Sequence, residues 1–349
     1  MNQTRDMLFA LARQRFTSPF QERVTALSCD GDVDWELVAA IAAGEGVAPI
    51  VGVNLAACKA VTPQIPTSVA QRFQNALFEN VALKAARRRQ LVDGVAHFDL
   101  RGYDVLLLKS AALEASGVYH HPWVTAARDV DLVLRRRNAT SASVDEWAVR
   151  AVSRDSGIEC EVNGHHDLSV YGLVNVSFEK IWQSAHQVPF GEPTNSVYVM
   201  CPEDLLFTLC LNTCRQRYFR LKALFDIAEA IAHHADLDWQ SLVARARTSD
   251  SEGIVFTALC AADETLGLPA VAREHYTQLV SRGYARLLRA LIKTSRRSPA
   301  SPPRLRALLL RYASFNNAQR LRAARRTLQQ WPSRVLTSTE LADGALPGQ

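Results

Sequence analysis

Two short stretches, YDVLLLKSAAL (103–113) and AARDVDLVL (126–134), place charged residues inside or at the end of apolar runs that predict buried strands. In the second stretch, Asp129 and Asp131 stand among valines and leucines. Residues two apart on a strand point to the same side, so both carboxylates are predicted to project together. A charge that loses water costs several kcal/mol unless it is compensated, and a like charge beside it adds to that cost. The pattern therefore predicts a cation close to the two aspartates.

The first stretch predicts a strand that runs directly into a helix, with Lys109 and Ser110 at the junction. A helix that begins at Ser110 presents backbone N–H groups and a partial positive charge, which suit phosphate oxygens. The Ser110 hydroxyl and the Lys109 ammonium add further donors. Two carboxylates on one strand face can hold one or two Mg²⁺ ions, which prefer oxygen ligands and share them with substrate phosphates. A third acid from a neighbouring strand would complete a two-metal site for in-line attack on phosphorus.

The hydrophobic pattern divides the chain into helical and strand-containing regions. Apolar residues at three-to-four spacing predict helices before and after a short region of strands. We therefore predict an α+β fold, with a small mixed-sheet core flanked by helical regions. The predicted parts are an N-terminal helical region (1–98), the core (99–200), a C-terminal helical domain (201–335) and a flexible tail (336–349).

Composition limits the class of protein. With 349 residues and 48% hydrophobic content, the chain has room for about two globular domains. No apolar run approaches the ~20 residues that cross a bilayer, and charges interrupt the first apolar run, so we expect neither a transmembrane segment nor a signal peptide. The seven cysteines form no CxxC pair, which predicts reduced thiols and a cytoplasmic location. Cys210 and Cys214 are predicted to be buried core residues.

Basic residues gather towards the C-terminus. The net charge is only +5, yet no acidic residue occurs between 275 and 339, where arginine and lysine recur throughout. Such a surface attracts polyanions and is also typical of a solvated helical surface. The region 275–339 is therefore a candidate contact for RNA or an acidic macromolecule.

The motifs resemble those of a known family. The pair LLLKSAAL (106–113) and RDVDLVL (128–134) is similar to the apolar–Lys-Gly and Asp-x-Asp-Leu signature of a nucleotidyltransferase family of uncharacterised bacterial proteins related to polymerase β. Later blocks resemble that family's helical region in the same order, and the resemblance covers about residues 80 to 270. These blocks are FEKIW (178–182), CPEDLLFTLCLN (201–212), RLKALFDIAEAI (220–231) and LDWQSLVARA (237–246).

The resemblance implies roles for individual residues. Asp129 and Asp131 would be catalytic metal ligands, and Lys109, Ser110 and Arg128 would bind the nucleotide. The third acid is Glu161 in IECEVN, which resembles a strand of the family. The alternatives are Asp167, on the second strand of a hairpin predicted around Asn163-Gly164, and Glu159, which shares a face with Glu161. On the helix after the core, Arg220 and Lys222 are candidate contacts for phosphate or acceptor, and Asp226 is expected to pair with an arginine.

The sequence departs from the family pattern at several polar positions. Ser110 stands where the family has Gly, which adds a Cβ where phosphate approaches the backbone. Thr125 stands where the family has Arg, and Asn163 where it has His. Asn212 and Gln216-Arg217 replace further histidine and lysine-histidine positions.

The resemblance implies a metal-dependent nucleotidyltransferase. With Mg²⁺ or Mn²⁺, it would move an NMP from an NTP such as ATP to an acceptor hydroxyl or amine and release pyrophosphate. The acceptor would be a protein or peptide, an RNA or a small molecule. The altered polar positions support an alternative, a catalytically weakened relative that acts as a nucleotide- or partner-binding module.

Overall fold

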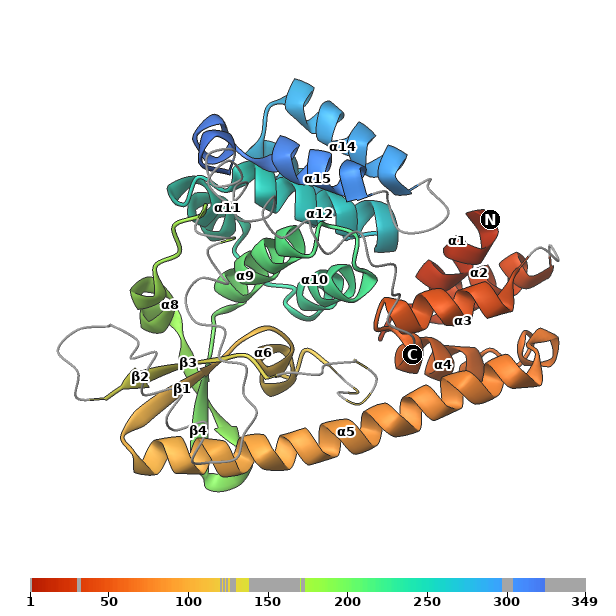
Figure 1. Cartoon of the computed structure of the whole chain (residues 1–349), viewed down its shortest axis with the longest axis horizontal. Coiled ribbons are helices and arrows are strands. Elements are labelled where there is room, and N and C mark those ends of the chain that lie inside the picture. Colours follow the sequence, from red (N-terminus) through yellow and green to blue (C-terminus); the bar gives the residue numbers. More distant parts are fainter. Residues whose placement is uncertain are drawn as a thin grey trace, which may run out of the picture.

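The structure is a computed structural model that describes residues 2–29, 33–119, 121, 123, 125, 130–137, 170, 173–296 and 304–323. Its described part combines helices with one four-stranded mixed sheet, which confirms the predicted α+β class. Figure 1 shows one long helix, α5, running along the base of the molecule, with the sheet and α6 next to it and α14 and α15 on the opposite side. None of the described helices is long and apolar enough to cross a membrane.

The sheet has the strand order β2-β1-β4-β3. Its central strand β1 runs antiparallel to β2 and parallel to β4, and β3 and β4 form an antiparallel hairpin. The apolar run of β1 is explained by its position, because Val105, Leu106 and Leu107 are all at most 2% exposed. The strands are β1 (Tyr103–Leu107), β2 (Leu132–Arg136), β3 (His186–Phe190) and β4 (Glu192–Val199).

Helix α5 (Thr67–Leu100) connects the N-terminal helices to the sheet. Its buried side chains recur every three or four residues, so one stripe faces the rest of the protein. The helix ends shortly before Gly102, whose φ of 77° lies in the left-handed region that glycine adopts readily. It packs against α3, α4, β1 and β4. The preceding helices are α1 (Asn2–Leu11), α2 (Ser18–Cys29), α3 (Trp35–Gly44) and α4 (Ala48–Ala57), followed by a 3-10 turn (Thr62–Gln64).

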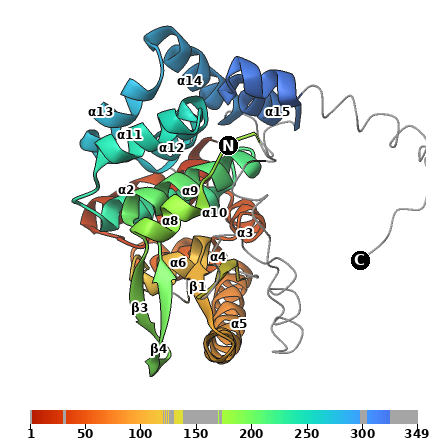
Figure 2. The same ribbon diagram turned by 90° about the vertical axis from the view of Figure 1, so that its left-hand side faces the viewer.

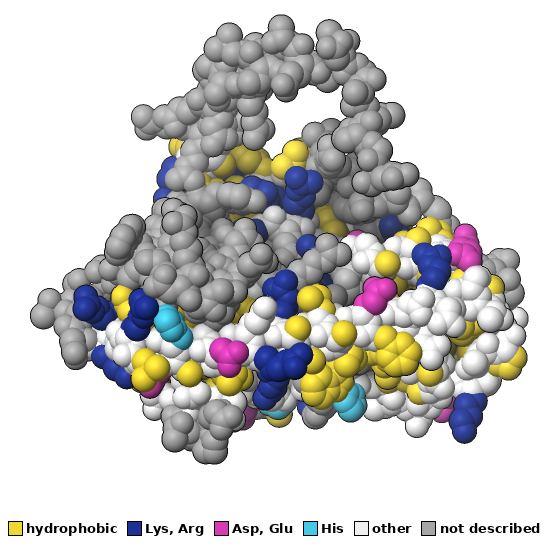
Figure 3. All heavy atoms as spheres, turned by 60° about the horizontal axis from the view of Figure 1, so that its bottom comes forward, with side chains coloured by type: hydrophobic (Ala, Val, Ile, Leu, Met, Phe, Trp, Pro, Cys, Tyr) yellow, Lys and Arg dark blue, Asp and Glu magenta, His cyan; other side chains and the backbone are white. Residues whose placement is uncertain are grey.

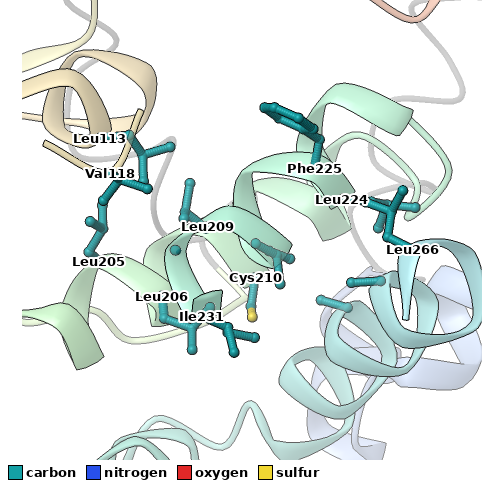
Figure 4. Close-up of a cluster of buried hydrophobic side chains, with 14 of the residues drawn as sticks. Leu113, Val118, Leu205, Leu206, Leu209, Cys210, Leu224, Phe225, Ile231 and Leu266 are labelled. Carbon is teal, nitrogen blue, oxygen red and sulfur yellow. The ribbon is translucent and has the colours of Figure 1, made fainter. Parts of the chain in front are cut away.

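The C-terminal helices pack as a bundle on α6 (Lys109–Ala115), which follows β1. Figure 4 shows the apolar contact, where Leu205 and Leu209 of α9 lie beside Leu113 and Val118. Cys210 and Cys214 of α9 are fully buried, as predicted, and burial raises the pKa of the Cys214 thiol to about 11. The helices are α9 (Pro202–Arg215), α10 (Leu221–His233), α11 (Trp239–Thr248), α12 (Glu252–Leu266) and α13 (Ala270–Tyr276), then a 3-10 turn (Thr277–Leu279).

Two further helices, α14 (Arg282–Arg296) and α15 (Arg304–Ser314), form an outer layer on α12. Figure 2 shows this layer above α9, α10 and α12, with α5 seen end-on below. The helix α8 (Phe178–Ser184) lies between β2 and β3 in sequence and is capped by the Ser177 side chain.

The structure corrects two predictions about strands. First, β2 begins at Leu132, so Asp131 lies immediately before the strand and not inside it, although Leu108 N still donates to Asp131 O at 3.0 Å. Second, the β3–β4 hairpin was not predicted, and its turn is made by Gly191 with a φ of 74°. The hairpin predicted around Asn163-Gly164 lies outside the described residues.

We predict that Gly253→Ala lowers the free energy of unfolding by about 1–3 kcal/mol, the usual cost of overpacking. A Cβ at Gly253 would lie 2.3 Å from the backbone oxygen of Ser314, so α12 and α15 must separate. Urea unfolding followed by circular dichroism measures the change. The matched control is Gly283→Ala on α14, where a Cβ meets nothing within 4 Å and the better helix propensity of Ala makes the variant at least as stable as wild type. Equal stability of both variants would contradict this packing.

Candidate functional site

The site begins where β1 meets α6. Leu108 is extended, and Lys109 adopts a φ of 49°, a left-handed conformation that is uncommon for residues other than glycine. Helix α6 starts at Lys109, one residue earlier than predicted. The unusual backbone at Lys109 turns the chain sharply from the strand into the helix, and such conformations cluster at functional sites.

Lys109 pairs with Asp131 across the β1–β2 edge. The Lys109 Nζ lies 2.8 Å from Asp131 Oδ1, and the two side chains are 18% and 8% exposed. The cation predicted beside the aspartates is therefore present at Asp131. It is Lys109, the lysine at the strand–helix junction that the sequence predicts to bind phosphate. Asp129 lies outside the described residues.

A buried polar cluster lies behind Ser110. Lys222 of α10 donates from Nζ to Ser110 Oγ at 3.2 Å, to Tyr119 Oη at 3.1 Å and to Asp226 Oδ1 and Oδ2 at 2.6 and 2.7 Å. Tyr119 also donates its hydroxyl to Asp226. Burial and the adjacent Asp226 carboxylate raise the pKa of Tyr119 well above its usual value, so the phenol stays protonated. Asp226 thus pairs with Lys222. The prediction that it pairs with an arginine is wrong.

A second buried cluster connects α5 to the segment before Asp131. Lys84 Nζ pairs with the Glu114 carboxylate of α6 and donates to Thr125 Oγ1 at 2.7 Å. Asn80, one turn earlier on α5, donates to the backbone oxygens of Trp123 and Thr125. Burial lowers the pKa of Lys84, and the Glu114 charge opposes that shift. The two α5 side chains therefore hold the chain at Trp123 and Thr125.

The other predicted residues divide into two groups. Arg220 is exposed at the residue before α10, and its charge acts on Glu45, which also accepts from Leu221 N at 2.7 Å. Of the two candidates on this helix, Lys222 is therefore the one that contacts Ser110. Arg128, Glu159, Glu161 and Asp167 lie outside the described residues, and their roles stay predictions.

The sequence reasoning missed Asn80, Lys84, Glu114 and Tyr119. A signal was present on α5, because Asn80 and Lys84 continue the three-to-four spacing of its buried stripe, between Phe73 and Leu91. A polar residue on such a stripe must find a hydrogen-bond partner when it is buried. No comparable local signal marks Tyr119, because its partners come from α10.

Several residues where the chain departs from the family pattern lie within the described part of the structure. Thr125, in place of the family's Arg, is 1% exposed and receives the Lys84 ammonium. Asn212 is buried in α9, and Gln216 follows the end of that helix. Arg217 adopts a φ of 62° in the turn between α9 and α10.

Among the described side chains, Asp131 is a predicted metal ligand whose chemistry fits a divalent metal. Its buried carboxylate supplies the oxygen donors that Mg²⁺ prefers, and its charge requires a cation nearby. Within the described residues, no group of three or more His, Cys, Asp or Glu side chains could hold a metal ion. The other predicted ligands, Asp129 and Glu161, fall outside this part of the chain.

Comparison with known proteins found one family. A family model described as "Uncharacterised nucleotidyltransferase" matches residues 31–267, more than half of the chain. This match includes the β1–α6 junction, Asp131, and helices α9 to α12. No curated protein and no solved structure matches the chain.

We predict that Asp226→Asn lowers the free energy of unfolding by about 3–5 kcal/mol, because it leaves the Lys222 ammonium buried without its counter-charge. Urea unfolding measures the effect. The control is Glu36→Gln, which removes a carboxylate from the exposed Arg72–Glu36 pair and should cost less than about 1 kcal/mol.

The double variant Lys222→Met with Asp226→Leu separates the cost of leaving the Lys222 charge unpaired from the net contribution of the ion pair. It removes both charges, so it should regain most of the lost stability. Asp226→Asn as stable as Glu36→Gln would show that the buried pair contributes little.

Proposed function

Because the chain belongs to the uncharacterised nucleotidyltransferase family, we propose that it moves a nucleoside monophosphate from a nucleoside triphosphate to an acceptor hydroxyl or amine. Family membership supports nucleotidyl transfer in general terms. The observation that carries the specific proposal is the contact between Lys109, at the β1–α6 junction, and Asp131, at the start of β2. One group suits a phosphate and the other a metal ion, and the fold holds the two side by side.

In the proposed reaction, the acceptor oxygen or nitrogen attacks the α-phosphorus and forms the new bond. The bond from that phosphorus to the β-phosphate oxygen breaks, and pyrophosphate leaves. Lys109 binds phosphate oxygens and offsets the charge that develops on the leaving group. Asp131, with Asp129 and Glu161 as predicted partners, would hold Mg²⁺ or Mn²⁺. When bound, such an ion supplies charge neutralisation and activation of the attacking group.

Ser110 and Lys222 support the phosphate site in this proposal. Ser110 is half-buried in the first turn of α6, and its hydroxyl accepts from Lys222. Lys222 is itself fixed by Asp226 and Tyr119, so the cluster orients the Ser110 hydroxyl. An oriented donor costs no reorganisation when the substrate binds.

The acceptor is proposed from the charge of the C-terminal helices. On α14, Arg289 and Lys293 lie near Glu264 of α12, at 3.4 and 3.7 Å, and are partly neutralised there. Arg282 and Arg286 are exposed on the same helix. These exposed cations support contact with an RNA or an acidic macromolecule through the region 275–339.

A second candidate function is a binding module without turnover. This function is favoured by Thr125, which stands where the family has Arg and is here part of the buried Lys84 cluster. Such a module would bind nucleotide and metal at Lys109 and Asp131 and transfer nothing.

Asp131→Ala is expected to reduce nucleotidyl transfer by at least about a hundredfold, since even the loss of an outer partner of a metal ligand costs about 10–100-fold. The full chain is incubated with each of the four α-labelled NTPs, Mg²⁺ or Mn²⁺ and cell extract, and label transfer is measured. Asp129→Ala should behave in the same way. Glu274→Ala, an exposed acid on α13, is the control and should transfer at the wild-type rate.

Two outcomes would contradict the transferase. Undiminished labelling in Asp131→Ala would show that the reaction occurs elsewhere. Tight binding of metal and nucleotide by the wild type, with no transfer to any acceptor, would support the binding module.

A further inference from the structure

A cavity of about 140 Å³ lies between α5, α6 and the β3–β4 hairpin. Helix α5 contributes three basic residues to it at helical spacing, Lys84, Arg87 and Arg88, so all three lie on one side of the helix. Figure 3 shows the face of the molecule along α5, where basic side chains lie next to apolar ones. Neither the metal prediction nor the phosphate junction uses this cavity.

The charges that line the cavity do not cancel. Among the described residues that line it, three cations and one carboxylate, Glu114, leave a net charge of +2. Lys84 pairs with Glu114, whereas Arg87 and Arg88 form no ion pair within the described residues. The Nε of Arg87 is buried and has no hydrogen-bond partner among those residues. A guanidinium in this situation suits an oxyanion, which it binds with two parallel hydrogen bonds.

The opposite walls are apolar. Phe190 of the hairpin is 8% exposed and lies 5.9 Å from the Arg88 guanidinium, and Val130 lines the same cavity. Ala111 and Ala115 of α6 are small and leave room beside the arginines. The ligand that this cavity fits therefore has a dianionic group at one end and an apolar part at the other.

The cavity adjoins the proposed catalytic site. Val130 directly precedes Asp131, and Ala111 directly follows Ser110. Along the chain, the lining of the cavity therefore reaches to within one residue of Ser110 and Asp131, on the side of α5 and the hairpin. The proposed nucleotide contact Ser110 is hydrogen-bonded to Lys222 of α10. The cavity is thus placed for the acceptor and not for the triphosphate.

We propose that this cavity, between Arg87, Arg88 and Phe190, binds a phosphomonoester group of the acceptor. The identification of the ligand as the acceptor rests on the proposed nucleotidyl transfer, whereas the phosphate site itself does not depend on that function. A phosphomonoester carries close to two negative charges at neutral pH, which matches the net charge of the cavity. A simple carboxylate carries one. Burial lowers the pKa of Lys84, and an anion that enters beside this lysine opposes that shift.

Calorimetric titration of the full chain with phenyl phosphate, inorganic phosphate and benzoate tests the proposal. Phenyl phosphate should bind more tightly than inorganic phosphate because of the apolar wall, and benzoate should bind most weakly. The double variant Arg87→Gln with Arg88→Gln should weaken phenyl phosphate binding at least tenfold. Arg89→Gln, which removes a charge from the same helix outside the cavity, should change it less than twofold.

Two further arms identify the ligand. A mixture of the four α,β-methylene NTPs with Mg²⁺ should not displace phenyl phosphate. Displacement, together with weaker NTP binding in the double variant, would assign the cavity to the nucleotide and overturn the proposal. A 5′-phosphorylated oligoribonucleotide that binds more tightly than its 5′-hydroxyl form, and loses this advantage in the double variant, identifies an RNA end as the source. Equal binding of both forms identifies a small phosphorylated acceptor.

The failure of either proposal can be recognised separately. Phenyl phosphate binding that is equal in wild type and double variant, or absent from both, overturns the phosphate site whatever the label-transfer result. Arginine-dependent phenyl phosphate binding with no label transfer keeps the phosphate site and refutes the transferase.

Discussion

The compensation of buried charge around α6 is the constraint on which this structure depends. Three lysines approach this short helix, and each meets one acid. Lys109 pairs with Asp131, Lys222 with Asp226, and Lys84 with Glu114. An unpaired charge in these positions would cost several kcal/mol. The Lys109–Asp131 and Lys84–Glu114 pairs therefore hold the start of β2 and helix α5 at the β1–α6 junction. The Lys222–Asp226 pair lies within α10, which is held at α6 by the hydrogen bonds from Lys222 to Ser110 and Tyr119.

The long helix α5 explains how the chain reaches this arrangement. Its first half packs against α3 and α4, and its second half against β1 and β4. Between them, Asn80 and Lys84 reach the backbone and side chain of Thr125. Thr125 is therefore positioned by two α5 residues that lie more than forty positions earlier in the sequence. The apolar stripe of α5 supplies the stability for this, since the polar contacts themselves contribute little net free energy.

Local pattern was sufficient to predict the elements that carry the site. The apolar run of β1, the helix after Lys109 and the stop at Gly102 follow from short-range rules, and the family motifs order the helices α9 to α11. The β3–β4 hairpin was missed because its five-residue first strand contains Pro189 and little alternation. The partners of Lys84 and Lys222 were beyond prediction for a different reason. Their contacts join residues 30 and 112 positions apart, and a single sequence contains no local trace of such pairs.

The Lys109–Asp131 pair shows how a folded site can be stable before its ligands arrive. In the proposed function, Lys109 exchanges the Asp131 carboxylate for a phosphate, and Asp131 exchanges the lysine for a metal cation. Each group is compensated before and after the exchange, so binding leaves no buried charge without a partner. Lys222 and Lys84 differ, because Asp226 and Glu114 belong to elements that pack directly on α6 or form it. Their pairs hold the site in place, whereas the pair at the junction is the one whose partners the substrate can replace.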